Sequence, residues 1–115
     1  MTLHIKRIYE PADGEDGTRI LIDRLWPRGV SKEDAHVDAW LRDVAPSTGL
    51  RQWFGHDPDK WDEFRRRYLA ELRNNTTAIE ELRRHIGQSA ATLLYGAKDT
   101  EHNNAVVLRD FMSTR

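Results

Sequence analysis

The sequence predicts a small three-layer α/β/α domain in which helices cover a mostly parallel sheet of about four strands. Its length of 115 residues is enough for one domain and too short for two separate cores, so we take residues 1–115 as a single domain. Hydrophobic residues make up 38% and charged residues 32%, which fits a compact core under a charged surface. Strand-like and helix-like segments alternate along the chain, which is typical of helices packed on parallel strands.

The N-terminal segments predict two strands joined by a turn. Residues 3–9 alternate between apolar and polar side chains, as in a strand. Residues 11–17 contain one Pro, two Gly and three acids, a turn composition that is too short for a helix. Residues 19–26 are an apolar, β-branched stretch that Pro27 and Gly29 terminate, and they are the candidate for the central strand.

The middle of the chain predicts a short helical turn followed by an ambiguous segment. Residues 31–34 (Ser-Lys-Glu-Asp) resemble a capping box, which begins a helix. In residues 37–46, apolar side chains at positions i, i+3, i+4 and i+7 favour a helix. Trp40, Val44 and Pro46 would instead share one face of a strand, so helix and strand both remain open.

The remaining segments predict helices and one more strand. Ser47 can cap a helix of two turns that ends at Gly55. Asp57 and the following proline begin a long amphipathic helix. Residues 77–80 form a second capping box, which starts a third helix. Finally, residues 91–95 form an apolar strand, and a polar loop then leads to an amphipathic helix at 105–112.

The composition excludes several classes of function. The formal net charge is −1, so no field of the whole molecule attracts it to nucleic acid or to a membrane. The chain has no cysteine, which removes disulfides, thiolate nucleophiles and thiolate metal ligands. No apolar run approaches the roughly 18 residues of a membrane span, and the first residues lack a secretory apolar segment. We therefore expect a soluble cytoplasmic protein.

The first candidate site lies at the end of the second predicted strand, where functional loops of parallel sheets begin. Arg24 and Arg28 can hold a phosphate or carboxylate through bidentate hydrogen bonds, and Trp26 can stack on a ring. Asp23 can orient an arginine or act as a general base. The structural alternative is an ion pair of Asp23 with Arg24 or Arg28 beside a core tryptophan.

The second candidate site follows the strand at residues 91–95 and opens the last helix. An anion can bind at the N-terminus of that helix, with Lys98 as an additional positive charge and with Asp99 and Asn103 beside it. His102 can act as an acid or base near neutral pH. The structural alternative is that Asp99 and Asn103 are ordinary helix caps and that His102 is an exposed or capping residue.

A third group, residues 51–57, is interpreted as structural. We expect Trp53 to lie in the core beside Phe54, and Arg51 and His56 to stay outside. His56 and the following Asp can form a catalytic dyad, but that Asp already serves as a helix cap. The five histidines and the carboxylates show no metal-ligand spacing, and the usual nucleotide-binding and hydrolase motifs are absent. We therefore expect no metal site and no cofactor.

Several of these segments together identify a family. They are Asp23–Gly29 (DRLWPRG), Ala45–Ser47 (APS), Leu50–Pro58 (LRQWFGHDP), Phe64–Tyr68 (FRRRY), Glu71–Leu72 (EL), Thr92–Tyr95 (TLLY) and His102–Leu108 (HNNAVVL). Over nearly its whole length the chain resembles the bacterial YeaO-like family, whose members are proteins of unknown function. The resemblance implies a parallel three-layer fold and a strand within residues 37–46.

The resemblance also bears on the second candidate site. Longer and more distant relatives carry a Cys-His-Arg sequence in the loop that corresponds to residues 101–104. Thiol chemistry cannot be carried over, because this chain has no cysteine. The shared position of the loop still supports a site there. Ser47 is a further candidate ligand-binding residue. The full set is Arg24, Trp26, Arg28, Ser47, Lys98, Asp99 and Asn103.

Three functions follow from these observations. The first is binding or catalysis on an anionic small molecule, in which Arg24, Arg28 and Lys98 hold the anion and Asp23 or His102 moves a proton. The second is a protein-interaction subunit without an active site of its own. The third is a nucleic-acid-binding module, which is disfavoured because the helical arginines are interleaved with glutamates.

Overall fold

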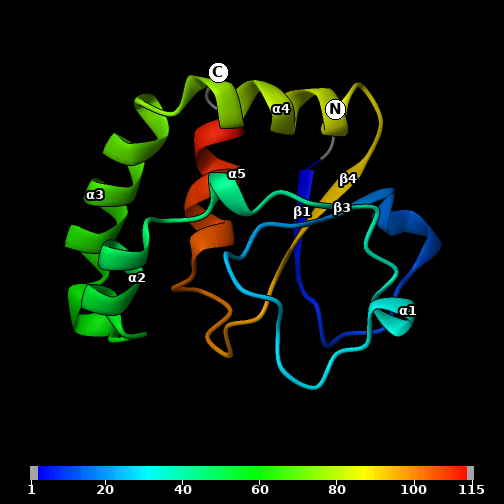
Figure 1. Ribbon diagram of the computed structural model, residues 1–115, viewed down its shortest axis with the longest axis horizontal. Helices are drawn as coiled ribbons and strands as arrows, with labels where there is room; N and C mark the ends of the chain where they lie inside the picture. The colour runs from blue at the N-terminus through cyan, green and yellow to red at the C-terminus, as the bar shows by residue number, and fades with distance from the viewer. Residues whose placement is uncertain (1–2, 114–115) are drawn as a thin grey trace.

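The computed structural model describes residues 3–113 and has an α/β architecture built on a parallel sheet (Figure 1). The four strands are β1 (Leu3–Arg7), β2 (Thr18–Leu21), β3 (Ala39–Trp40) and β4 (Ala91–Tyr95). Their order in the sheet is β1-β4-β2-β3, and every pairing is parallel. The predicted α/β class and the parallel sheet are confirmed.

The register of the sheet brings the strand ends to one edge. Ala91 of β4 is paired with Leu3 of β1 on one side and with Thr18 of β2 on the other. Just past these strands, the Ile8 and Ile22 amides donate to carbonyls of β4, so the chains leave the sheet at nearly the same level. The loops that follow β2 and β4 therefore lie side by side, although many residues separate them in sequence.

Four helices form one core with the inner face of the sheet. They are α2 (Thr48–Phe54), α3 (Trp61–Arg73), α4 (Thr76–Ile86) and α5 (Asn104–Ser113). Helix α5 contacts β1 and β4, α4 contacts β2, and α3 packs between α5 and α2. Each helix has an apolar face that is buried in this core, as expected for amphipathic helices. None of the helices in the described range is long and apolar enough to cross a membrane.

The outer face of the sheet has a thinner cover. It consists of the single turn α1 (Lys32–Ala35) and of the loops on either side of it (Figure 1). Leu21 and Leu94 of the sheet are fully buried there, against Trp26 and Trp40 among others. The third layer of the fold is therefore mostly loop, held by tryptophan packing.

Local signals placed most helix starts correctly. Ser31 and Ser47 accept hydrogen bonds from the backbone of α1 and α2, which confirms both as N-caps. The capping box at residues 77–80 is wrong, because α4 already begins at Thr76 and has no side-chain cap. The side chain of Asn75 instead donates to the Asp43 carbonyl at 2.9 Å. The residue before this helix is therefore held by a tertiary contact and not by a capping box.

Two strand predictions need correction. The strand expected over residues 19–26 ends at Leu21, since the chain turns after the last ladder bond and reaches Pro27 through a loop. Residues 37–46 contain both types of structure. They form the two-residue strand β3, as the family resemblance implied, and then a short 3-10 helix at Arg42–Val44. Neither the helical nor the strand periodicity describes the whole segment, because a two-residue edge strand is too short to produce an alternating pattern.

Candidate functional site

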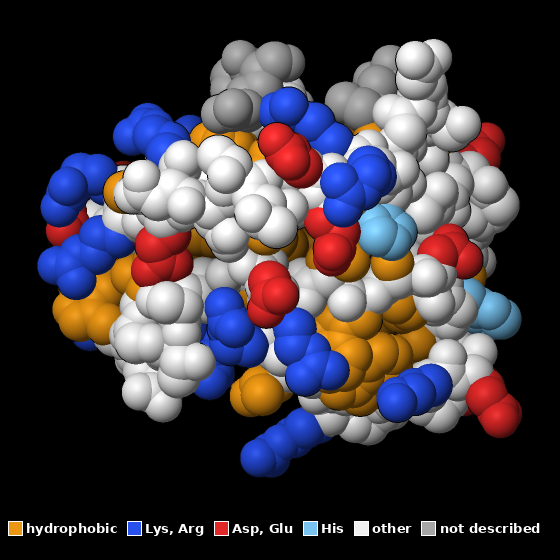
Figure 2. All heavy atoms as spheres, turned by 45° about the horizontal axis from the view of Figure 1, so that its top comes forward, with side chains coloured by type: hydrophobic (Ala, Val, Ile, Leu, Met, Phe, Trp, Pro, Cys, Tyr) orange, Lys and Arg blue, Asp and Glu red, His pale blue; other side chains and the backbone are white. Residues whose placement is uncertain are grey.

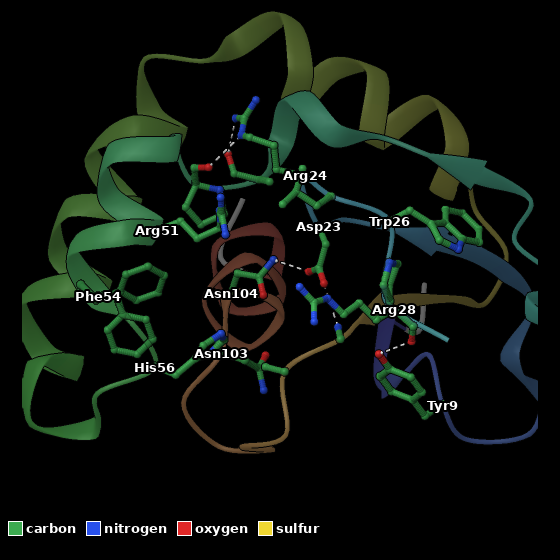
Figure 3. Close-up of a pocket in the computed structure, with 17 residues that line it drawn as sticks. Tyr9, Asp23, Arg24, Trp26, Arg28, Arg51, Phe54, His56, Asn103 and Asn104 are labelled. Carbon is green, nitrogen blue, oxygen red and sulfur yellow. Dashed lines mark hydrogen bonds between the residues drawn. The ribbon is translucent and has the colours of Figure 1, made fainter. Parts of the chain in front are cut away.

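A pocket of about 400 Å³ lies at the carboxyl edge of the sheet (Figure 3). Its walls come from the loops after β1, β2 and β4, the segment before α2, α2 with the turn after it, α3 and the start of α5. The polar and charged side chains that line it are those of Tyr9, Asp23, Arg24, Arg28, Arg51, His56, Asn103 and Asn104. The sheet topology thus collects side chains that are distant in sequence.

Asp23 lies in the middle of this pocket (Figure 3). Its Oδ2 accepts the Gly96 amide at 2.8 Å, and its Oδ1 accepts the Asn104 Nδ2 at 3.1 Å. A Cβ on residue 96 would stand 3.1 Å from Oδ2, so a glycine there allows the carboxylate to approach the backbone. These two bonds tie the loop after β2 to the loop after β4 and to α5.

The electrostatic environment of Asp23 is unusual for a surface aspartate. Burial raises the pKa of its carboxyl group, and hydrogen bonds from Asn104 and Gly96 only partly oppose that effect. His56 and Arg51 also lower this pKa, but by less than the hydrogen bonds do. Within residues 3–113, Asp23 forms no ion pair, so the expected structural alternative of a pair with a neighbouring arginine is not observed.

Two predicted arginines contribute to the pocket walls in different ways. Arg24 is fixed, because its Nε and NH2 donate to the carbonyls of Pro46 and Ala45 at 3.2 and 3.3 Å. Arg28 is exposed at the rim. Its loop is held by the Tyr9 hydroxyl, which donates to the Arg28 carbonyl at 2.9 Å. One guanidinium group is therefore positioned and the other is free to reorient.

Two further residues of the pocket with basic side chains were expected to stay outside. Arg51 and His56 are exposed, as expected, but both line the pocket from the α2 side (Figure 3). The chain reverses at the end of α2 through left-handed conformations, with φ of 53° at Gly55 and 58° at His56. Gly55 was the sequence signal that could have placed His56 in the pocket. A glycine that ends a short helix reverses the chain, and the next side chain is then directed back toward that helix.

Trp26 and Asn103 line the pocket but are occupied by other contacts. The Trp26 indole donates to the Val30 carbonyl at 2.7 Å and packs edge-on against Trp40, with ring centroids 5.4 Å apart. Asn103 is buried, and its Oδ1 accepts the Val106 amide at 3.1 Å as a cap of α5. The ring-stacking role predicted for Trp26 is thus restricted by its packing on the outer face.

Four predicted site residues do not line the pocket. Ser47 caps α2 and donates its hydroxyl to Glu71 at 2.6 Å, and its amide donates to the same carboxylate at 2.8 Å. Lys98 is exposed in the loop after β4. Asp99 and His102 form a separate pair in that loop. The two loops are adjacent, but only the first contributes its charged groups to the pocket.

The Asp99–His102 pair is held by local contacts. The His102 Nδ1 lies 2.9 Å from an Asp99 oxygen, and its ring packs edge-on against Trp61 with centroids 5.2 Å apart. The pKa of Asp99 is lowered because the backbone amides of Glu101 and His102 donate to it. These contacts match the structural alternative, in which Asp99 caps the turn and His102 has no catalytic role.

The pocket therefore has an excess of positive charge in a chain whose net charge is −1. Three arginines line it against a single carboxylate, and none of the three forms an ion pair in the part of the chain that the structure covers. The arginines of α3 differ, since Arg66 and Arg67 both pair with Glu63. Over residues 3–113, no cluster of three or more His, Cys, Asp or Glu could hold a metal ion.

The fold and this pocket define a small α/β protein with a cationic cavity at the carboxyl edge of a parallel sheet. The chain belongs to a family described as "Inactive DUF488-N3 subclade", whose model matches residues 2–115. It is 43% identical over 112 residues to the uncharacterised protein YeaO of Escherichia coli, covering 97% of each chain. It is 40% identical over 113 residues to an uncharacterised protein of Mycobacterium tuberculosis, covering 98% of this chain and 95% of the relative. The YeaO-like resemblance is thus confirmed. No solved structure matches.

Proposed function

We propose that this protein binds a small organic anion, such as a phosphate or carboxylate, in the pocket at the carboxyl edge of the sheet. The observation that carries the proposal is the charge of the lining: Arg24, Arg28 and Arg51 surround the cavity without an ion pair among the described residues. Guanidinium groups match the geometry of phosphate and carboxylate oxygens. A bound anion would be the negatively charged partner of these three arginines.

The size and the apolar part of the pocket support a small molecule. A volume of about 400 Å³ falls in the usual range for small-molecule sites. Phe54 and Phe64 line it and stack on each other with centroids 4.2 Å apart, which gives the cavity a rigid aromatic wall. Such a site suits an anion with an apolar or partly apolar body better than a bare inorganic ion.

Binding is favoured over nucleophilic catalysis. The description of the family contains the word "inactive", and the chain lacks the cysteine that would serve as a thiol nucleophile. His102, the other candidate for proton transfer, is engaged by Asp99 and Trp61 away from the pocket. The proposed role is therefore recognition of the anion, with Asp23 as a polar contact and not as a general base.

A nucleic-acid-binding role is less well supported. Arg66 and Arg67 of α3 are paired with Glu63, and Arg65 is paired with Asp110, so these charges are partly neutralised within the protein. Across the upper part of the face in Figure 2, acidic side chains stand among the basic ones, without an unbroken basic stripe. Nucleic-acid binders need such a stripe to follow the phosphate backbone.

A protein-interaction role is the second candidate, because two large hydrophobic side chains are exposed at the pocket rim. Leu25 is 61% exposed and Tyr9 is 46% exposed. Exposed apolar groups beside a pocket are common at docking sites. This role would leave the three pocket arginines without an anionic small-molecule ligand, so a binding screen separates the two functions.

The test is a thermal-shift and calorimetric screen with phosphate, sulfate, organic phosphates and carboxylates. A ligand at 100 times its dissociation constant should stabilise the protein by about 2.7 kcal/mol. We expect Arg51→Gln to weaken binding by about tenfold or more, because it removes a charged hydrogen bond. Arg84→Gln is the matched control, since Arg84 is exposed on α4 and does not line the pocket. Absence of any shift, or equal weakening by both variants, would contradict the proposal.

A further inference from the structure

One carboxylate lines a pocket that otherwise presents cationic, amide and apolar groups. Asp23 is the single acidic residue in the lining, and it lies between Arg51 of α2 and the loop that carries Arg28 (Figure 3). An anion bound by the arginines would be repelled by this carboxylate at close range. A site that served a simple anion would be stronger without it, so the position of Asp23 calls for a ligand group of a different kind.

The contacts of Asp23 orient the carboxylate without neutralising it. The Gly96 amide occupies one position on Oδ2, and the Asn104 amide occupies one on Oδ1. An ionised carboxylate offers about four acceptor positions, so each oxygen retains one for a further donor. Both protein donors are uncharged, and Asp23 has no basic partner within ion-pairing distance in residues 3–113.

A purely structural role explains this arrangement poorly. Half-burying a carboxylate that has no basic side chain within ion-pairing distance costs free energy, and a neutral side chain at position 23 would avoid that cost. The loops are joined independently by Asn104, whose Nδ2 also donates to the Ile22 carbonyl at 3.2 Å. Asp23 lines the same cavity as the three arginines, so a ligand in that cavity lies beside its carboxylate.

We infer that the ligand carries two groups: an anionic group that the arginines hold, and a hydroxyl or ammonium group that donates a hydrogen bond to Asp23. This inference rests on the proposed function and specifies its ligand class. The ligand is a small hydroxylated or amino-bearing phosphate or carboxylate. Discrimination comes from Asp23, because a ligand without the donor places its negative charge beside a half-buried carboxylate whose remaining acceptor positions it cannot fill.

The test uses three probes that share one anionic group and one chain length: propyl phosphate, glycerol phosphate and aminopropyl phosphate. Their dissociation constants are measured by calorimetry for the unmodified protein, Asp23→Asn and Arg51→Gln. Asp62→Asn is the matched control, because Asp62 is exposed on α3 and does not line the pocket. Circular dichroism establishes that each variant is folded.

We expect the unmodified protein to bind at least one donor-bearing probe about tenfold tighter than propyl phosphate. In Asp23→Asn this preference should largely disappear, and propyl phosphate should bind tighter than before because the repulsion is removed. The preference for the ammonium probe should fall most, since Asp23→Asn removes the charge attraction to the ammonium group, while an amide oxygen can still accept a hydrogen bond from either donor. Asp62→Asn should keep the original preference.

The outcomes separate the two proposals. Equal binding of all three probes, with weaker binding of all three to Arg51→Gln, would overturn the inference and leave the anion site intact. No binding of any probe would overturn both. If Asp23→Asn does not fold, the comparison of the three probes on the unmodified protein still decides, because the preference is a property of that protein alone.

Discussion

Two aspartates at opposite ends of β2 show how the surroundings of a carboxylate set its charge. Asp16 precedes the strand, and although burial raises its pKa, hydrogen bonds from Asp13, Lys6 and Arg19 together lower it below the ordinary value of 3.8. Asp23 follows the strand, and there burial raises the pKa, because the hydrogen bonds from Asn104 and Gly96 and the smaller effects of His56 and Arg51 only partly oppose it. One carboxylate is stabilised in its charged form, and the other is destabilised.

This contrast predicts opposite pH dependences for two variants. The folded protein holds a proton on Asp23 more tightly than the unfolded chain, so its contribution to stability falls as pH rises above about 3.8. Relative to the unmodified protein, Asp23→Asn should therefore gain stability as pH rises from acid to neutral. The gain is about 1.4 kcal/mol for each tenfold difference in proton affinity between the folded and unfolded states. Urea unfolding at acid and neutral pH measures it.

Asp16→Asn is the contrasting variant. The pKa of Asp16 is lowered, so its favourable contribution is present above the unfolded pKa and is lost as pH falls through the folded pKa. The destabilisation caused by Asp16→Asn should therefore grow from acid to neutral pH, opposite in sign to the trend of Asp23→Asn. Parallel trends in the two variants would show that burial does not control the charge of Asp23.

At the scale of single elements, caps determine where the helices begin and how they are joined. Ser47 caps α2 and also binds Glu71 of α3 through both its hydroxyl and its amide. Ser31 caps α1 through one hydrogen bond at an exposed site. Both serines were expected to cap the helical segment that follows them, and nothing in the sequence showed that their caps differ in strength. The difference between them arises from α3, which only the folded chain brings next to Ser47.

The two caps therefore should differ in their effect on stability. Ser47→Ala should lower the free energy of unfolding by about 2 kcal/mol, the upper end of the range for a lost cap, because Glu71 loses its hydroxyl partner as well. Ser31→Ala should cost about 0.5 kcal/mol. Chemical denaturation of both variants provides the comparison. A larger loss for Ser31→Ala would mean that the link from α2 to α3 contributes little.

At the scale of the whole molecule, the two faces of the sheet are covered unequally. Leu93 and Leu94 are neighbours on β4, and both are fully buried. Leu93 belongs to the large core under the four helices, whereas Leu94 belongs to the small cluster under α1 and its loops. Loops can relax around a deleted side chain more easily than packed helices can, so the same substitution should leave different cavities.

We accordingly expect Leu93→Ala to be the more damaging of the two substitutions. It should cost about 4–5 kcal/mol, near the top of the range for buried leucines, and Leu94→Ala about 3 kcal/mol. Equilibrium unfolding in urea measures both, and unchanged slopes would show that the variants unfold from the same compact state. Equal losses would indicate that the loop layer is packed as rigidly as the helical layer.

Residue patterns along the chain were sufficient for the local features of this protein. They predicted the buried strand β4, the serine caps of α1 and α2, the end of α2 at Gly55 and the apolar faces of the long helices, because each depends on neighbours within a few positions. Where a tertiary contact intervenes, as between Asn75 and Asp43 before α4, the local prediction failed.

The composition of the candidate site was decided by the tertiary structure. The sequence placed Asp23, Arg24 and Arg28 at or near the end of a predicted strand, but it did not show that Arg51 and His56 would line the same pocket. That depends on the strand order, which sets β4 beside β2, and on the chain reversal after α2. Local patterns carry no information on which distant segments pair, since pairing is set by the burial of the whole core. The sequence thus supplied the charged groups, and the fold selected which of them share a cavity.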